Sequence, residues 1–108
     1  MFYRQRVESA VRRSAKVDAN HSLIVGALRA CGATVQSLAA IGGGCPDLLV
    51  GHRGRIHLFE IKDGSKPPSA RKLTPDQETW HAAWRGAPVL VIESVEQAIT
   101  ALVDKPCN

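Results

Sequence analysis

The chain of 108 residues lacks several features that mark membrane, secreted and zinc-binding proteins. No apolar run approaches the roughly 20 residues of a membrane-spanning helix, and the opening Met-Phe-Tyr-Arg-Gln-Arg has no apolar signal-peptide core. The three cysteines, Cys31, Cys45 and Cys107, are odd in number and show no CxxC spacing, which argues against a disulfide framework and a zinc knuckle. We therefore expect a cytosolic protein with reduced thiols.

Internal repeats, low-complexity segments and clustered metal-ligand histidines are also absent. His52, His57 and His81 show no ligand spacing that would make a zinc centre, so we interpret them as turn, strand-face and helix residues. The length, with 44% hydrophobic and 22% charged residues, suits one compact domain. We assign residues 17–104 to that domain and expect one active site.

Positive charge is concentrated before this domain. The formal net charge is +4, and residues 1–16 carry five Arg and Lys against a single Glu, whereas the remaining chain carries nine of each sign. A basic arm favours a polyanionic partner, because phosphate contacts release counterions. Apolar residues at helical spacing within it leave a second interpretation open, a helix packed on a partner subunit. As nucleic-acid contacts in this arm we predict Arg12, Arg13 and Lys16.

The densest chemistry lies between Cys45 and Lys62, where two apolar runs flank a turn at Arg53-Gly54. A two-residue loop that ends in glycine predicts a β-hairpin, in which paired residue numbers sum to 107. Asp47 then lies opposite Glu60. Directly opposed residues hold their Cβ atoms about 4.5–5.5 Å apart, so the hairpin brings two carboxylates together.

Two facing carboxylates repel each other unless a cation lies between them. Mg²⁺ and Mn²⁺ bind carboxylate, carbonyl and water oxygens, so Asp47 and Glu60 are candidate metal ligands, with the backbone carbonyl of Ile61 as a third. Lys62 falls on the face of Glu60 by strand alternation and can hold an attacking water and stabilise charge developing on phosphorus. The pattern indicates metal-assisted phosphodiester hydrolysis.

A structural explanation of the same residues is available. Pro-Asp commonly opens a strand or a turn, and Glu-x-Lys is an ordinary solvent-facing alternation. The acidic residues here lie inside very apolar runs, however, where an unpaired carboxylate is costly. That cost favours the functional interpretation.

The remaining pattern predicts an α/β fold in the order αβββαβα, with a mixed sheet and helices on its faces. We expect Asp18 to cap a first helix that ends at Gly32, a strand over 33–38, and a surface loop without helix or strand over 63–72. Capping boxes at Thr74 and Ser94 open two later helices around a strand over 89–93. The predicted core contains Leu23, Ile24, Leu28, Leu48, Val50, Leu58, Ile61, Val89, Val91, Ile99 and Leu102, with Trp80 and Trp84 anchoring the second helix.

Two loops are candidate phosphate contacts. The run Gly42-Gly43-Gly44 leads into Asp47 and lacks the Lys-Ser/Thr ending of a P-loop, so it is either a plain turn or a place where backbone approaches a phosphate. The basic loop after Lys62 is either a solvated surface or a backbone-phosphate contact. The candidate residues in these loops are Gly43, Gly44, Lys66, Arg71 and Lys72.

The chain resembles the PD-(D/E)XK nuclease superfamily in Pro46-Asp47, twelve further residues and Glu60-Ile61-Lys62. Within it, the chain is similar to stand-alone virus-type replication-repair nuclease (VRR-NUC) domains of phages and prophages, over roughly residues 16–102. Segments that carry this similarity are Gly42–Gly51, Phe59–Lys62, Pro68-Ser69, Leu73–Gln77 and Trp84-Arg85-Gly86.

The resemblance implies a Mg²⁺- or Mn²⁺-dependent DNA endonuclease, with Asp47, Glu60 and the Ile61 carbonyl on the metal and Lys62 on the water. It implies a site role for Gln77, and His21 is the candidate where relatives carry a first-helix Glu. It also implies a homodimer acting on branched DNA such as Holliday junctions, in replication or repair. A non-catalytic nucleic-acid-binding module and an assembly subunit are the competing hypotheses.

Overall fold

The central sheet is built on the predicted hairpin. In the computed structural model, which describes residues 20–103, β2 (Leu48–His52) pairs with β3 (Arg55–Ile61). The register runs from His52 opposite Arg55 to Leu48 opposite Phe59, which confirms the predicted pairing over the strands. Arg53 and Gly54 both have positive φ, 52° and 79°, as a tight hairpin turn requires.

The sheet has four strands in the order β1-β2-β3-β4. β1 (Thr34–Ser37) runs antiparallel to β2, and β4 (Val89–Ile92) runs parallel to β3. The crossover from β3 to β4 contains a 3₁₀ helix, η1 (Pro68–Arg71), and α3 (Pro75–Ala83). The expectation that 63–72 holds no helix is therefore wrong, since Pro68 opens this short turn at the first helical position.

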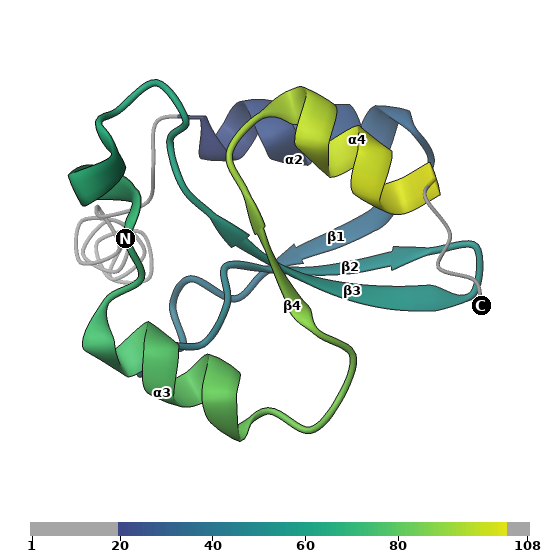
Figure 1. Cartoon of the computed structure of the whole chain (residues 1–108). Helices are drawn as coiled ribbons and strands as arrows, with labels where there is room; N and C mark the ends of the chain where they lie inside the picture. The colour runs from purple at the N-terminus through teal and green to yellow at the C-terminus, as the bar shows by residue number, and fades with distance from the viewer. Residues whose placement is uncertain (1–19, 104–108) are drawn as a thin grey trace, which may run out of the picture.

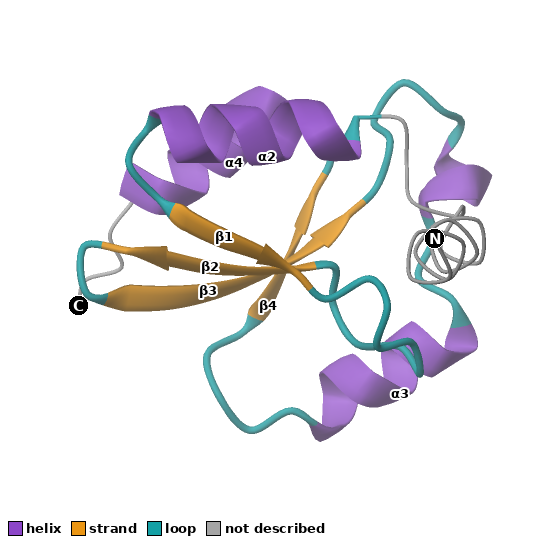
Figure 2. Cartoon of the chain, turned by 180° about the vertical axis from the view of Figure 1, so that it is seen from behind, coloured by secondary structure: helices purple, strands orange, loops and turns teal. Residues whose placement is uncertain are grey.

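Helices lie on both faces of the sheet (Figures 1 and 2). α2 (His21–Ala30) and α4 (Val95–Val103) lie together over one face, and α3 lies on the opposite side. We call the first face the helix-covered face and the second the open face. The α/β class and the αβββαβα order, with a mixed sheet flanked by helices, are as predicted and are consistent with a PD-(D/E)XK-like core.

The helix ends show one departure from the sequence prediction. Gly32, with φ of 92°, follows the end of α2 as expected. Asn20, rather than Asp18, occupies the N-cap position of α2, and Asp18 lies outside the described residues. The Asn20 Nδ2 donates to the carbonyls of Lys62 and Glu93 at 3.0 and 3.1 Å, so it ties the start of α2 to the ends of β3 and β4.

The capping box predicted at Thr74 is present, whereas only one of the two bonds of the box predicted at Ser94 forms. At α3, the Thr74 side chain accepts from Gln77 N while the Gln77 side chain accepts from Thr74 N. At α4, Ser94 Oγ accepts from Gln97 N at 3.1 Å, but Gln97 Oε1 accepts from Glu93 N at 2.7 Å. That second bond reaches the end of β4 and fastens α4 to it.

The hydrophobic core lies under the helix-covered face. Strand alternation places Val89 and Val91 opposite Leu58 and Glu60, on the open face, which explains why neither is buried as predicted. Leu23 and Trp84 are exposed, and Trp80 and Ile99 are half-buried, which also corrects the prediction. Leu58 is buried on the open face. The core under the helices is Ile24, Leu28, Ala33, Val35, Leu48, Val50, Phe59, Ile61, Ile92, Ala98 and Leu102.

Two bulk expectations can be compared with the described residues. Cys31 and Cys45 are free thiols, and Cys107 lies outside the described residues. Within residues 20–103, no helix has the length and apolar character needed to cross a membrane.

His57 generates a pH-dependent prediction. Its ring lies 5.7 Å from that of Phe59, and burial, followed by the charges of His52 and Arg55, lowers the pKa of His57 below its ordinary 6.5. Below that pH the unfolded chain binds a proton at this residue that the folded chain resists, so the contribution of His57 to stability falls with falling pH. His57→Gln cannot bind that proton. Urea unfolding at a series of pH values tests this. As the pH is lowered from about 8 to about 5, we expect the free energy of unfolding of wild type to fall relative to that of His57→Gln.

A matched variant separates this effect from packing. His57→Leu also lacks the titrating group but introduces an apolar side chain, so its absolute stability differs from that of His57→Gln. Its pH trend relative to wild type should be the same as that of His57→Gln. A gap between wild type and both variants that stays constant with pH would contradict the assignment.

Candidate functional site

Two buried charges at the end of β3 define the candidate site. The Glu60 residue is 1% exposed and Lys62 is 9% exposed, and they are the buried charged residues of the described chain. Burying a charge is costly unless it is paired and hydrogen-bonded. Lys62 N donates to Ile92 O at 2.9 Å, so the strand ladder fixes the backbone at this point, and the two side chains find their partners on α3.

Gln77 joins the two charges. Its Nε2 donates to Glu60 Oε2 at 3.0 Å, and its Oε1 accepts from Lys62 Nζ at 3.0 Å. The same Oε1 accepts from Thr74 N at 2.9 Å, so one side chain caps α3 and holds both charges. The sequence predicts a capping box at Thr74, and the resemblance implies a site role for Gln77. The structure shows that one amide bonds to the cap and to both charged residues.

His81 is a site residue that the sequence prediction missed. Its Nε2 lies 3.1 Å from Glu60 Oε1, within reach of a hydrogen bond, and its side chain is half-buried. Burial, with a smaller effect from Lys62, lowers the pKa of His81. The available signal was its spacing, since His81 follows Gln77 by four residues and both therefore lie on one face of α3.

Asp47 lies beside Glu60, at the end of the hairpin ladder. Its N–H donates to Phe59 O at 3.0 Å, and its Oδ2 accepts from Ile61 N at 2.7 Å. These bonds go to the residues on either side of Glu60. The bond from Ile61 N is accepted by the Asp47 side chain rather than by a backbone carbonyl of β2, so the regular backbone ladder ends here. The Cys45 thiol is half-buried near both acids. Burial, and then the negative charges of Glu60 and Asp47, raise the pKa of Cys45.

The donor set fits a hard divalent cation. Asp47 and Glu60 supply carboxylate oxygens. The N–H and C=O of one residue in a β-strand point to the same side, and the Ile61 N–H donates to Asp47. The Ile61 carbonyl therefore also points toward Asp47. Within residues 20–103 there is no group of three or more His, Cys, Asp and Glu arranged to hold a metal. An ion here would complete its shell with water and substrate oxygens, as Mg²⁺ ordinarily does.

The glycine loop before Asp47 packs against the start of α3. A Cβ placed on Gly44 would overlap Asp76 O and lie 2.9 Å from Gln77 N, so only glycine permits this approach. Gly43 has φ of 66°, and a Cβ there would meet nothing within 4 Å. The contact with α3 accounts for glycine at position 44, whereas no neighbouring atom requires glycine at position 43.

The other predicted contacts have varied surroundings. The Arg71 guanidinium donates to Lys66 O at 2.8 Å and pairs with Glu93 at 3.1 Å, so it braces the loop after β3. The side chains of Lys66 and Lys72 are exposed. His21 Nε2 is buried with no hydrogen-bond partner in the described structure, so His21 is not joined by that atom to the carboxylates. The predicted contacts outside the described residues are Arg12, Arg13 and Lys16.

No family model, no curated protein and no solved structure matches the chain.

The close contact at Gly44 can be tested by adding one methyl group. Gly44→Ala and Gly43→Ala both place alanine at positive φ, where a side chain costs about 1–2 kcal/mol. Only at Gly44 does the methyl group also meet the backbone of α3, which adds about 1–3 kcal/mol of overpacking. We expect urea unfolding to show the larger loss of stability for Gly44→Ala; equal losses would contradict the contact.

The bridging role of Gln77 can be separated from its capping role. Thr74→Ala removes the cap and costs about 1 kcal/mol. Gln77→Leu removes the other bond of the box, from Thr74 N to Gln77 Oε1. It also leaves Glu60 and Lys62 without this partner, which costs about 1–3 kcal/mol more for a buried polar group. We expect the difference to appear in the free energies of unfolding. If Thr74→Ala and Gln77→Leu are equally destabilised, the bridge contributes nothing to stability.

Proposed function

We propose that this chain is a divalent-metal-dependent DNA endonuclease of the VRR-NUC type, with Asp47, Glu60 and Lys62 as its catalytic residues. The observation that carries the proposal is the pair of buried charges, Glu60 and Lys62, held by Gln77 beside Asp47. Apolar residues of similar size would stabilise the fold at least as well as such a buried pair, so stability alone does not account for it. The fold and the order of motifs agree with the PD-(D/E)XK resemblance in the sequence.

The proposed reaction is hydrolysis of a phosphodiester bond. Mg²⁺ or Mn²⁺ bound by Asp47, Glu60 and the Ile61 carbonyl would act as a Lewis acid on the scissile phosphate. Lys62 positions the attacking water, and its positive charge stabilises the negative charge that grows on the phosphoryl oxygens. As the water oxygen bonds to phosphorus, the bond from phosphorus to the leaving oxygen breaks, which leaves one terminal phosphate and one hydroxyl.

The residues on α3 act through the catalytic residues. Gln77 Oε1 accepts from Lys62 Nζ, which fixes the direction of the ammonium group. Gln77 Nε2 and His81 Nε2 lie on the two oxygens of Glu60 and limit the rotation of its carboxylate. We therefore assign Gln77 and His81 as positioning residues, and His21 receives no role in this mechanism.

The substrate is proposed to be DNA, including branched forms such as Holliday junctions. This preference and the homodimer come from the VRR-NUC resemblance. The exposed Lys66 and Lys72, on the loop that follows Lys62, are proposed to contact backbone phosphates. Such contacts give affinity that falls as salt rises.

The proposal is tested with plasmid, linear and four-way-junction DNA, each with Mg²⁺, with Mn²⁺ and with EDTA. We expect cleavage that requires metal and that falls about 10²–10⁴-fold in Lys62→Met. Asp47→Asn should also lose cleavage, because it removes a carboxylate ligand. Lys66→Met is the matched control for loss of a lysine, and it should weaken binding while it leaves the cleavage step intact.

The outcomes separate the competing functions. Cleavage that survives both EDTA and Asp47→Asn would contradict the mechanism. Salt-sensitive DNA binding without product in any metal would favour the non-catalytic binding module. Neither binding nor cleavage would favour the assembly subunit.

A further inference from the structure

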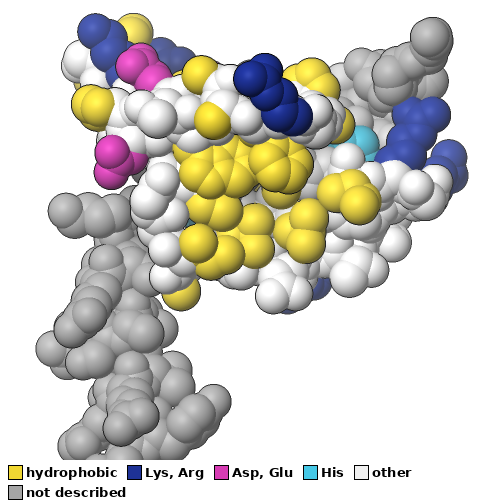
Figure 3. Space-filling view, turned by 90° about the horizontal axis from the view of Figure 1, so that it is seen from below, with side chains coloured by type: hydrophobic (Ala, Val, Ile, Leu, Met, Phe, Trp, Pro, Cys, Tyr) yellow, Lys and Arg dark blue, Asp and Glu magenta, His cyan; other side chains and the backbone are white. Residues whose placement is uncertain are grey.

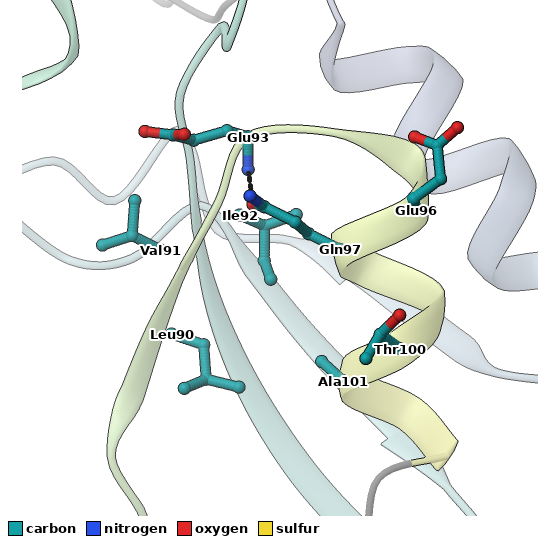
Figure 4. Close-up of a pocket in the computed structure, with 8 residues that line it drawn as sticks. All are labelled: Leu90, Val91, Ile92, Glu93, Glu96, Gln97, Thr100 and Ala101. Carbon is teal, nitrogen blue, oxygen red and sulfur yellow. Dashed lines mark hydrogen bonds between the residues drawn. The ribbon is translucent and has the colours of Figure 1, made fainter. Parts of the chain in front are cut away.

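A groove runs between β4 and α4, on the helix-covered face of the sheet (Figure 4). Its volume is about 590 Å³, and its apolar lining includes Leu90, Ile92 and Ala101. Leu90 lies opposite Phe59 in the neighbouring strand, yet it is 40% exposed because β4 is the last strand of the sheet. Apolar surface of this kind is a place where another segment can bind.

The charged side chains of the groove are acidic. Glu93 and Glu96 line it, with Gln97 and Thr100 as further polar residues. The Glu93 carboxylate pairs with Arg71. Glu96 is exposed, and among residues 20–103 no Lys or Arg pairs with it. The groove therefore suits a segment that carries positive side chains next to apolar ones.

The hydrogen bonds at the end of β4 exclude an added strand there. Glu93 N donates to Gln97 Oε1 at 2.7 Å. Glu93 O accepts from Gly64 N at 3.2 Å and from Asn20 Nδ2 at 3.1 Å. An amphipathic helix, in contrast, binds an apolar groove through its side chains and needs no main-chain partner.

The basic arm, residues 1–16, has the side chains that match this groove. Its apolar residues at helical spacing are Tyr3, Val7, Ala10 and Val11, which form one stripe along a helix. Arg4 and Arg6 flank that stripe on its two sides. Residues 3–11 as a helix are about 13 Å long, which is also about the length of the four residues of β4.

The described chain begins beside the groove. Asn20 Nδ2 donates to Glu93 O at 3.1 Å, and Glu93 is one of the residues that line the groove. Residues 12–19 connect Val11 to Asn20. An extended segment of that length spans about 27 Å, so the arm is long enough to reach any part of the groove.

Two other combinations of segment and surface fit less well. Hydrophobic side chains also gather on the surface seen from below, on the side of α3 (Figure 3). Asn20 precedes α2, which lies on the opposite side of the sheet, so that surface is farther from the arm. Residues 104–108 follow α4 but contain no Leu, Ile, Val, Phe or Tyr with which to fill the groove.

We propose that residues 3–11 form an amphipathic helix that docks in the groove between β4 and α4 of the same chain. The apolar stripe covers Leu90 and Ala101, and the flanking arginines lie beside Glu96. Of the two interpretations that the sequence leaves open for the arm, the groove favours a packed helix, with its own chain as the partner.

Docking of the arm does not depend on the proposed nuclease activity, and it is measured without DNA. It would have one consequence for the nuclease, which rests on the proposed function. The predicted DNA contacts Arg12, Arg13 and Lys16 lie between the docked helix and Asn20, which donates to the Lys62 carbonyl. Docking would therefore hold these basic residues near the end of the sheet that carries Lys62.

The test is hydrogen–deuterium exchange of the full chain, measured by mass spectrometry on peptides from the arm, at low protein concentration and without DNA. We expect the amides of the arm to exchange about tenfold or more slowly in wild type than in Leu90→Lys, because the lysine places a charge in the apolar groove. Ile56→Lys is the matched control, since Ile56 is 68% exposed on the open face of β3; it should keep the protection.

Charge reversal gives a second measurement. Glu96→Arg should lower the protection of the arm, and Arg4→Glu with Arg6→Glu in the same chain should restore it. Glu78→Arg is the matched control. Glu78 and Glu96 both lie in the first turn of a helix, so both variants lose the same interaction with the helix dipole, but Glu78 lies on α3 and its variant should keep the protection.

Several outcomes would overturn the proposal. Unprotected arm amides in wild type would do so, as would protection that survives Leu90→Lys or is lost in Ile56→Lys. Equal protection in Glu96→Arg and Glu78→Arg would contradict the charge match. Protection that rises with protein concentration would place the arm on a second copy, and protection that requires DNA would assign it to a polyanion; either result would overturn docking within one chain.

Discussion

The burial of Glu60 and Lys62 is the constraint on which the remaining structure depends. Two charged groups leave water at the end of one strand, and the fold is stable only where other groups replace that water. Gln77 supplies a donor to one and an acceptor to the other, and His81 reaches the second oxygen of Glu60. Although α3 buries none of its own residues, its place in the fold is set by these polar contacts and by the backbone fit at Gly44.

The sheet divides its two faces between stability and chemistry. The helix-covered face holds the apolar core, while the open face carries Glu60. Its neighbours in β3, Phe59 and Ile61, are packed in that core and fix the position of the strand. Asn20 extends this division, because it fastens the start of α2 to the ends of β3 and β4, immediately behind the charged pair. Glu60 thus lies in β3, Asp47 directly precedes β2 and Lys62 directly follows β3. The residues that orient Glu60 and Lys62 come from a separate helix, α3.

The sequence was sufficient wherever local chemistry decides the structure. The turn at Arg53-Gly54 sets the hairpin register, and the Thr74 capping box marks the start of α3, because each depends on residues adjacent in the chain. Face assignment was harder. Val91 and Trp84 look like core residues until one knows that helices fully cover only one side of the sheet. His81 was missed because its partner, Glu60, lies 21 residues away, and Asn20 was missed because its carbonyl partners lie still farther along the chain.

The two tryptophans of the chain are at the C-terminal end of α3, where their rings stack at a centroid distance of 5.0 Å and an angle of 18°. The indole N–H of Trp84 donates to Ala87 O at 2.9 Å, so the pair has a defined local environment. Every photon of indole emission from this protein consequently originates next to the helix that orients Glu60 and Lys62. The native chain carries a built-in optical reporter of that helix, and no extrinsic dye is needed to follow it.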